Sequence, residues 1–345
     1  MQYAPAVAPA TDLTSPAVPT LLTVNWVRQR ERTITSSHHP VLGTQLQLTV
    51  SGSSRAIAAA QRRALAEFER LERMLSVYRP DSEMNRWAAG EVDQPGDELG
   101  AVLRLAADWQ RRSDGAFNAA TGVIADRWKQ AVVVGETPDA AEMASLAASV
   151  RAPRFAVVDD RIERLGDCSA VNLNAVAKGY IVDRVAASLG CNPADCSARA
   201  EGRRISRVVV NAGGDLTHRG AGTLRVGVEN PAQPFDNAAP LTVVTLENES
   251  MATSGSSRRG FRVGQRWFGH VIDPRNGQPV DHIASASVIA PDTATADVLA
   301  TVLMVLTPEA GLAVADTLAD VAVCIVEADG TLWRNDAWLR REARQ

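Results

Sequence analysis

The sequence predicts an α+β fold, a single large domain with a mixed, sheet-rich body and helices packed on it. Apolar strands and amphipathic helices follow one another without a regular βαβ rhythm. The chain contains no Walker A motif and no Gly-x-Gly-x-x-Gly turn between a strand and a helix, which disfavours a classical dinucleotide fold. Its 345 residues, 46% hydrophobic and 22% charged, are typical of a globular protein with a sizeable core.

The N-terminal segment MQYAPAVAPATDLTSPAVPT is rich in Pro, Ala and Thr. It lacks the basic start, the apolar stretch and the early cysteine of an export signal or lipid anchor. We therefore expect a disordered tail over residues 1–40 and a domain over residues 41–345. The expected location is cytoplasmic, or periplasmic if the sequence is truncated. No apolar run approaches the roughly 18 residues of a membrane span, and a net charge of −4 with 5% aromatic residues argues against a nucleic-acid partner.

The first half of the chain predicts one strand, three helices and a hairpin. Ser53 or Ser54 can cap the strongest helix, whose apolar residues recur at helical spacing. Asp159 and Asp160 suit the turn of the hairpin. The expected elements are a strand over 41–52, helices over 53–78, 98–113 and 138–149, a loop over 113–122 and a hairpin over 155–165.

The second half predicts mainly strands, with two helices. Gly190 can end the first of these helices, and Asp292 or Thr293 can cap the second. The expected elements are a helix within 172–190, a strand over 207–215 with a double-glycine turn, a strand and a small-residue loop over 241–257, a strand over 284–291 before the second helix, and a last strand over 321–332.

The four cysteines do not form a metal-binding pattern. Cys168, Cys191, Cys196 and Cys324 include no Cys-x-x-Cys pair and no nearby histidine, so a zinc site is not expected. Cys191 and Cys196 flank a short loop and could form a disulfide, but a cytoplasmic setting favours free thiols.

The helix expected over ATADVLATVLMVL contains Asp297 and Thr301, four residues apart. This spacing places the carboxylate and the hydroxyl on one helix face. They can be an exposed Asp near the helix start, where a negative charge suits the helix dipole, or two oxygen ligands of a hard cation. The segment alone favours the exposed Asp.

Other loops combine small residues with single polar groups. Asp215 follows the double glycine of NAGGD, Lys178 is expected in the first turn of a helix, and His270 precedes Asp273 in HVIDPRNGQPV. Each feature alone is more typical of a turn or a solvated surface. Such loops could hold a phosphorylated ligand, because turn glycines and free N–H groups can bind anions.

Eight motifs stand in order along the chain: VLGT, SVYRPDSEMNRW, DGAFNAATG, NLNAVAKGYIVDRVA, VVVNAGGD, MATSGSS, HVIDPRNGQPV and ATADVLATVLMVL. Together they resemble the successive motifs of the FAD:protein FMN transferases, the ApbE family, from about residue 41 to about residue 327. The resemblance implies an ApbE-like domain with the flavin site in a cleft between two lobes. It also implies FAD as substrate, Mg²⁺ as cofactor, and transfer of FMN to a Thr or Ser hydroxyl of a target flavoprotein, with release of AMP.

The resemblance also implies roles for individual residues. Asp297, Thr301 and the backbone carbonyl of Ala175 match the metal ligands. His270 is the candidate for taking the proton of the attacking hydroxyl or orienting the phosphate, and Asp273 for orienting its loop or the histidine. The start of the helix near Thr293 is a further candidate for holding phosphate oxygens. The residues expected along FAD are Leu42, Tyr78, Ala116, Phe117, Asn118, Asn172, Lys178, Thr253, Ser254, Gly255 and Ile272.

The chain departs from the family pattern at a few positions. Asn118 and Asn172 stand where relatives carry acidic residues, Asn276 stands where Thr is usual, and the segment 191–206 is long. The loop after TSG also lacks the usual aromatic residue. These changes leave two alternatives open, a Mg²⁺-dependent FAD pyrophosphatase that makes FMN and AMP, and a non-catalytic FAD-binding homologue. The intact metal ligands favour the transferase over both.

Overall fold

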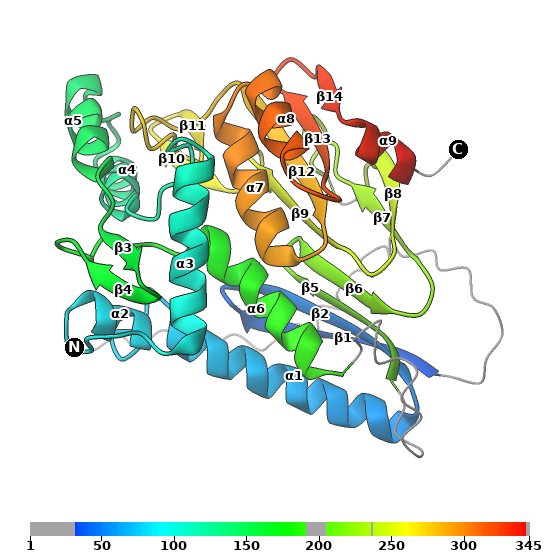
Figure 1. Cartoon of the computed structure of the whole chain (residues 1–345). Helices are drawn as coiled ribbons and strands as arrows, with labels where there is room; N and C mark the ends of the chain where they lie inside the picture. Colours follow the sequence, from blue (N-terminus) through cyan, green and yellow to red (C-terminus); the bar gives the residue numbers. More distant parts are fainter. Residues whose placement is uncertain (1–31, 191–204, 236, 343–345) are drawn as a thin grey trace, which may run out of the picture.

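The computed structural model describes residues 32–190, 205–235 and 237–342, and it confirms the predicted α+β fold (Figure 1). Its centre is an antiparallel eight-stranded sheet with the order β1-β2-β5-β6-β9-β12-β13-β14. The strands are β1 (Arg32–Val41), β2 (Thr44–Gly52), β5 (Ile205–Ala212), β6 (Asp215–Gly220), β9 (Ser250–Gly255), β12 (Ile283–Ala290), β13 (Ala322–Glu327) and β14 (Leu332–Arg334).

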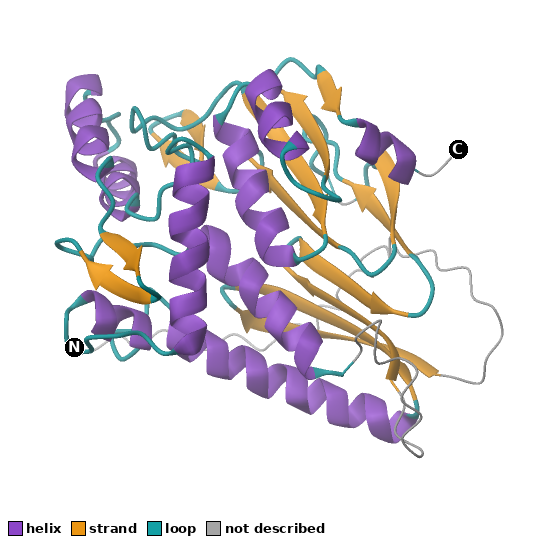
Figure 2. Cartoon of the chain, in the orientation of Figure 1, coloured by secondary structure: helices purple, strands orange, loops and turns teal. Residues whose placement is uncertain are grey.

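Three two-stranded ribbons and a set of helices surround this sheet (Figure 2). The ribbons pair β3 (Phe155–Val158) with β4 (Arg161–Arg164), β7 (Leu224–Val228) with β8 (Thr242–Leu246), and β10 (Gly260–Val263) with β11 (Arg266–Gly269). The helices are α1 (Ser54–Leu75), α2 (Glu83–Ala88), α3 (Asp97–Arg112), α4 (Gly122–Val134), α5 (Ala140–Val150), α6 (Asn174–Ser188), α7 (Thr293–Val305), α8 (Pro308–Asp316) and α9 (Asp336–Arg341).

The two faces of the sheet are covered differently. Helices α1, α6 and α7 pack on one face and form the main hydrophobic core with it. The ribbon β7–β8 and helix α9 cover part of the other face, where a second core includes the fully buried Trp338. A third, smaller core joins α4, α5 and the ribbon β10–β11 around Trp128, so these elements form a smaller lobe beside the sheet.

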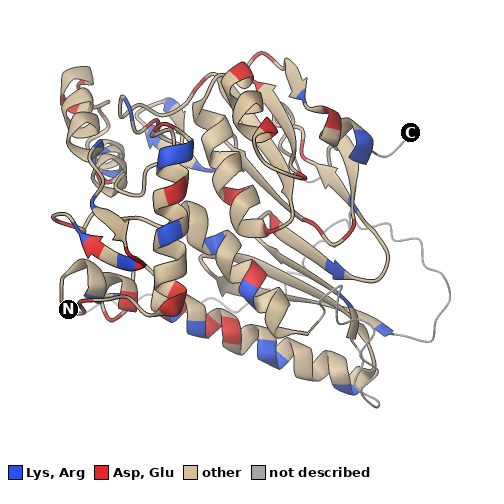
Figure 3. Cartoon of the chain, viewed as in Figure 1, with Lys and Arg blue, Asp and Glu red and all other residues tan. Residues whose placement is uncertain are grey.

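Helix α1 illustrates how the sequence pattern determines an element. The side chain of Ser53 accepts a hydrogen bond from the N–H of Ala56 at 3.3 Å and caps the helix, as the sequence predicts. The apolar face includes Phe68 and Leu71, which are almost completely buried. The opposite face displays charged residues of both signs (Figure 3).

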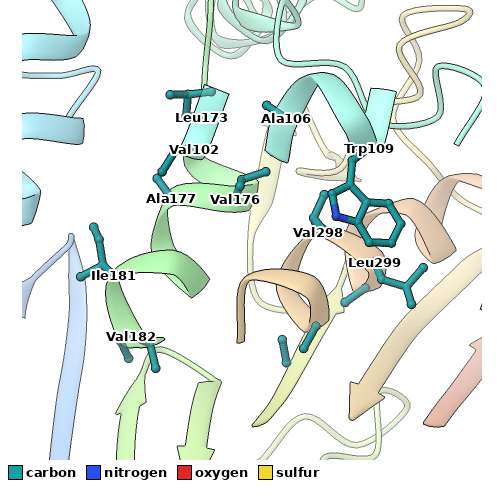
Figure 4. Close-up of a cluster of buried hydrophobic side chains, with 14 of the residues drawn as sticks. Val102, Ala106, Trp109, Leu173, Val176, Ala177, Ile181, Val182, Val298 and Leu299 are labelled. Carbon is teal, nitrogen blue, oxygen red and sulfur yellow. The ribbon is translucent and has the colours of Figure 1, made fainter. Parts of the chain in front are cut away.

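Helices α3, α6 and α7 pack closely in the main core (Figure 4). Gly179 of α6 faces the start of α7, where an added Cβ would lie 2.5 Å from the carbonyl oxygen of Thr293. Only glycine permits this approach, which brings the two helix backbones together. Helix α7 is buried along almost its whole length. The interpretation of Asp297 as an exposed residue near the helix start is therefore wrong.

Several elements differ from the sequence predictions. Residues 32–40, expected within the tail, form most of β1, because their alternating Thr, Ile and Ser residues pair with β2. The loop expected after the strand near residue 242 is the strand β9, which pairs with β12 inside the sheet. Lys178 lies in the second turn of α6 rather than the first. The tail 1–31 and the pair Cys191 and Cys196 lie outside the described residues.

The predicted hairpin and the predicted cap of the helix after residue 292 lie where expected. The hairpin 155–165 has Asp159 and Asp160 at its turn, both with positive φ, and Asp292 caps α7 through a hydrogen bond to the N–H of Thr295. Cys168 and Cys324 are buried free thiols. Across the described ranges, no helix combines the length and the apolar character that a membrane crossing requires.

The sheet opens between β6 and β9. These strands pair only at Leu216 with Met251 and at Thr217 with Ser250. Beyond Met251, strand β9 continues with β12 alone, while the chain before Leu216 turns back through Gly213 and Gly214 into β5. The gap leaves room for a cavity beside α6 and α7.

Candidate functional site

A cavity of about 860 Å³ lies at this gap, between the main body and the smaller lobe. Its walls come from the ends of β5, β6 and β9, from α6 and α7, and from the segments around residues 116–118 and 270–274. The volume is within the range of small-molecule and cofactor sites. The predicted site residues that line it are Tyr78, Ala116, Phe117, Asn118, Asn172, Ala175, Lys178, Thr253, Ser254, Gly255, His270, Ile272, Asp297 and Thr301.

Asp297 lines the cavity and is only 5% exposed. Its Oδ2 accepts a hydrogen bond from the N–H of Gly179 at 3.2 Å and lies 3.3 Å from Nζ of Lys178. Burial raises the pKa of this carboxyl, and the Lys178 ammonium opposes that shift. The exposed-carboxylate interpretation is therefore excluded, and Asp297 is a buried charge turned toward a cavity.

Lys178 lies between two buried carboxylates. Its Nζ forms ion pairs with Oδ2 of Asp297 and with Oδ2 of Asp215, which is 2% exposed. Burial lowers the pKa of Lys178, while the attraction of Asp297 raises it. One ammonium thus faces two carboxylates, and the cluster has an excess of negative charge if all three groups are ionised.

Thr301 lies one helical turn after Asp297 on the same face of α7, as the sequence spacing predicts. Its Oγ1 donates to the backbone carbonyl of Asp297 at 3.3 Å and lies 3.4 Å from Oγ of Ser254 in β9. The hydroxyls of Ser254 and Thr301 and the carboxylate of Asp297 therefore form one oxygen-rich wall.

The start of α6 contributes another wall. The side chain of Asn172 accepts a hydrogen bond from the N–H of Asn174 at 2.9 Å and so forms the turn that begins the helix. The amide of Asn174 donates to the hydroxyl of Tyr78 at 2.9 Å, which fixes a ring that is 74% exposed. Ala175 lines the cavity in the first turn.

Asn118 is held by the loop that joins α3 to α4. Its Nδ2 donates to the carbonyl of Val150 at 2.8 Å, and its Oδ1 accepts from the N–H of Ala120 at 2.7 Å. An aspartate could accept the second bond but could not donate the first. The asparagine at this position thus has a local structural role.

His270 follows β11 and is exposed to the cavity. The cavity walls crowd the imidazole and, together with the nearby charge of Arg259, lower the pKa of His270 below its ordinary value. Its segment is held in place because Trp128 donates to the carbonyl of Gly277 at 2.9 Å and Arg275 donates to the carbonyl of Val305 at 3.2 Å.

Asp273 does not line the cavity and does not contact His270. Its carboxylate accepts hydrogen bonds from the guanidinium of Arg275 at 2.9 and 2.8 Å and from the backbone N–H of the same residue at 2.9 Å. Of the two roles expected for Asp273, this geometry accommodates only the organisation of its own loop.

Two expected features lie away from the cavity. Leu42 forms the turn between β1 and β2 with a φ of 51° and packs against the main core. The start of α7 is closed to an anion, because Asp183 accepts hydrogen bonds from the N–H groups of Thr293 and Ala294 at 2.9 Å each. Burial raises the pKa of Asp183 to about 6, and these hydrogen bonds oppose the shift.

The segment 252–257 is likewise less open than a Ser/Thr-rich loop. The hydroxyl of Thr253 lies 2.8 Å from that of Ser287, and the N–H of Ser256 donates to the carbonyl of Ala284 at 3.1 Å. Pairing with β12 therefore occupies some of the hydroxyl and N–H groups that we expected to be free to bind an anion.

Asp215 was not among the predicted site residues and does not itself line the cavity, but it forms an ion pair with the cavity residue Lys178. It begins β6 directly after the double glycine, and its register with β5 brings it to Lys178. The motif NAGGD was a visible signal, but only the long-range pairing of the strands shows that its carboxylate enters the site.

The comparisons with known proteins agree with this architecture. The sequence model of the ApbE family matches residues 42–325. A FAD:protein FMN transferase of Klebsiella pneumoniae is 29% identical over 286 residues, which cover 78% of this chain and 77% of that protein. The FAD:protein FMN transferase of Escherichia coli K12 is 27% identical over 291 residues, covering 78% and 77%.

Solved structures show the same fold. The ApbE protein of Thermotoga maritima aligns with a TM-score of 0.76 and 20% identity over 91% of this chain and all of that one. The flavin transferase ApbE from Vibrio cholerae aligns with a TM-score of 0.71 and 21% identity, covering 90% and 99%. Since its family model spans most of the sequence, this chain belongs to the ApbE family.

Proposed function

We propose that this chain is a Mg²⁺-dependent flavin transferase, which moves FMN from FAD to a Thr or Ser hydroxyl of a target protein and releases AMP. The relatives named FAD:protein FMN transferase support the reaction class. The observation that favours it most in this chain is the buried cluster of Asp215, Lys178 and Asp297, of which Lys178 and Asp297 line a cofactor-sized cavity.

The residues of this cluster fit a hard cation. Asp297 and Asp215 are buried carboxylates beside the Lys178 ammonium, and their negative charge would stabilise a bound divalent ion. Asp297, Thr301 and the carbonyl of Ala175 are the ligands we propose. The described residues contain no cluster of three or more His, Cys, Asp or Glu side chains, which suits Mg²⁺ because this ion keeps several water and phosphate ligands.

A bound Mg²⁺ supplies electrostatic stabilisation of the negative charge on a diphosphate and its leaving group. The chain's own residues have three further tasks. Lys178 contributes a fixed positive charge beside the phosphates, the wall of Ser254 and Thr301 orients polar groups, and Tyr78 provides an aromatic face at the entrance.

His270 is the proton acceptor that we propose. Because its pKa is lowered, the imidazole is neutral near pH 7 and can accept a proton on a ring nitrogen. The acceptor oxygen forms a bond to the phosphorus nearest the flavin, the bond from that phosphorus to the AMP oxygen breaks, and the hydroxyl proton passes to His270. AMP leaves with the electron pair of the broken bond.

The substitutions Asn118 and Asn172 do not argue for a non-catalytic homologue. Both amides form hydrogen bonds to the backbone that shape the walls of the cavity. We therefore expect these residues to position the loops around FAD rather than to remove the reaction.

The variant Asp297→Ala tests the proposal. The purified chain is incubated with FAD, MgCl₂ and an acceptor protein containing an Asp-Gly-Ala-Thr motif, and flavin fluorescence is measured on the acceptor band of a denaturing gel. We expect Asp297→Ala to keep its circular dichroism spectrum and to lose about 100-fold or more in rate, the scale of a lost charge-stabilising group. The control Asp316→Ala, an exposed carboxylate on α8, should retain full activity.

Three results would contradict the proposal. Full activity of Asp297→Ala would exclude the metal assignment. Release of AMP at the same rate without an acceptor would identify a pyrophosphatase. FAD that remains bound and unchanged through purification and incubation would identify a flavin-binding protein without transfer activity.

A further inference from the structure

The segment from Ser250 to Ile272, which includes several residues that line the cavity, carries an excess of positive charge. It contains four arginines and no carboxylate, in a chain whose net charge is −4. The arginines are Arg258, Arg259, Arg262 and Arg266, and they lie on or directly before the ribbon β10–β11. Figure 3 shows basic residues on this ribbon.

The ribbon is continuous with the mouth of the cavity. Arg258 and Arg259 precede β10, His270 follows β11, and all three residues line the cavity. Arg258 pairs with Glu229 at 2.7 Å. Arg262 and Arg266 lie further out and do not line the cavity, so they are not part of the proposed FAD site.

One face of the ribbon is a fixed aromatic and cationic platform. Arg262 and Trp267 are cross-strand partners, and the guanidinium carbon of Arg262 lies 6.0 Å from the centre of the Trp267 ring. The indole N–H donates to the carbonyl of Ser256 at 2.8 Å. Gly260 permits this position of the ring, because an added Cβ would lie 2.8 Å from it.

The opposite face of the ribbon anchors it to the smaller lobe. Phe261 and Phe268 pack on Trp128 with ring centres 6.1 and 5.0 Å away, and the guanidinium carbon of Arg266 lies 4.9 Å from the centre of the Phe268 ring. Trp267 remains 44% exposed. Within the described residues, neither Arg262 nor Arg266 has a carboxylate partner at ion-pair distance, so both guanidinium groups are available to a ligand.

We propose that the turn end of the ribbon β10–β11, with Arg262 and Trp267 on one face and Arg266 on the other, is a docking surface for an acidic segment of the acceptor protein, next to the hydroxyl that receives FMN. This inference rests on the proposed transferase function, because an acceptor hydroxyl must reach His270 and its protein must then lie on the rim of the cavity. Guanidinium groups bind carboxylates in a planar, two-point geometry, and arginines held on aromatic rings lose less entropy when they bind. The surface contributes to affinity and encounter rate rather than to the chemical step.

The test uses two fluorescein-labelled peptides with the same central Asp-Gly-Ala-Thr sequence, flanked by glutamates in one and by glutamines in the other. Binding is measured by fluorescence anisotropy for the wild-type chain, for Arg262→Glu/Arg266→Glu and for the control Arg55→Glu/Arg62→Glu. The control makes the same charge change on the exposed face of α1, which does not line the cavity.

We expect the wild type and the control to bind the glutamate peptide about tenfold more tightly than the glutamine peptide, from a few exposed charge pairs. Arg262→Glu/Arg266→Glu should lose this preference while its affinity for FAD is unchanged. In the transfer reaction the same variant should raise KM for the glutamate peptide and leave kcat unchanged.

Each result that contradicts the docking surface leads to a different conclusion. Equal peptide preference in the variant and the wild type overturns the docking surface. A parallel loss of FAD affinity assigns the arginines to the dinucleotide, and lost binding to phosphatidylglycerol vesicles with unchanged peptide preference assigns them to a membrane surface. If the wild type prefers the glutamate peptide but transfers no flavin to it or to the acceptor protein, the proposed transferase function is wrong. The preference of the ribbon for an acidic peptide would still be shown by the anisotropy measurement.

Discussion

The imidazole of His270 is exposed to the cavity but is crowded by its walls, and both effects matter for its chemistry. A lowered pKa keeps the ring neutral at a pH where an ordinary histidine, with a pKa of 6.5, is half protonated. The ring is therefore ready to accept a proton near neutral pH. A side chain of the same shape that cannot titrate would keep the contacts and lose the reaction.

The pH dependence of transfer follows from this shift. In the proposed mechanism His270 acts as a neutral imidazole, so the rate should be constant at neutral and alkaline pH and should fall when the pH drops through the lowered pKa. We expect this acidic limb in kcat/KM measured between about pH 5 and 9, and its absence in the residual activity of His270→Gln. An unchanged acidic limb in that variant would assign the titration to another group.

Among single residues, the i, i+4 spacing placed Asp297 and Thr301 on one helix face, but only the resemblance to the ApbE family implied that they are metal ligands. The sequence did not indicate the partnership of Asp215 with Lys178, which depends on the register of β6 with β5 and on the position of α6. The helix start at Thr293 had the right local sequence for an anion, but a distant residue, Asp183, occupies its N–H groups. Local patterns thus identified candidates, and tertiary pairing decided among them.

At the scale of elements, the contact between α6 and α7 fixes the geometry of the site. Gly179 allows the two backbones to approach, and its N–H holds the carboxylate of Asp297. Asp183 then joins the second half of α6 to the start of α7. The position of the Asp297 carboxylate is therefore set by backbone packing, and Lys178 reaches it from the residue next to Gly179.

The variant Gly179→Ala tests this contact. Its Cβ would lie 2.5 Å from the carbonyl oxygen of Thr293 and 2.8 Å from Cα of Ala294, both of them backbone atoms. The better helix propensity of alanine offsets only about 1 kcal/mol. We expect a net loss of about 1–3 kcal/mol in the free energy of unfolding measured with urea, together with weaker transfer activity.

The matched control is Gly166→Ala, where nothing lies within 4 Å of the added Cβ and no positive φ is required. This variant should unfold at the same urea concentration as the wild type. A stability of Gly179→Ala equal to that of the control would show that α6 and α7 can separate without cost.

The elements that the sequence predicted well have strong local signals. Helix α1 has a serine cap and a continuous apolar face, and the hairpin β3–β4 has two aspartates at its turn. Strand β9 was not recognised because its Ala, Thr, Ser and Gly residues are typical of a loop, and its burial comes from pairing with β12. Helix α4 was missed because its exposed residues Val132, Val133 and Val134 obscure the apolar stripe.

At the scale of the whole molecule, the cavity lies where the main body, the split in the sheet and the smaller lobe meet. A ligand bound there contacts elements that are far apart in sequence. Binding to the folded state alone must then stabilise the fold by mass action.

Thermal unfolding measures this effect. At a free FAD concentration 100 times its Kd, the folded state gains about 2.7 kcal/mol. For a chain of this length, that gain raises Tm by about 4 °C. We expect this rise in a circular dichroism melt with FAD and MgCl₂ and a smaller one without MgCl₂. An unchanged Tm at saturating FAD would show that the dinucleotide does not bind the native cavity.

Helix α7 is enclosed by other elements along nearly its whole length, and it includes both of the side chains proposed to hold the cation. Backbone amides in such a position exchange their hydrogens with water only when the entire body opens. The two side chains proposed to hold the cation therefore do not lie on a separately melting part of the fold. Loss of function on heating and loss of the fold should be one cooperative event, in contrast to enzymes whose active groups lie on loosely held loops.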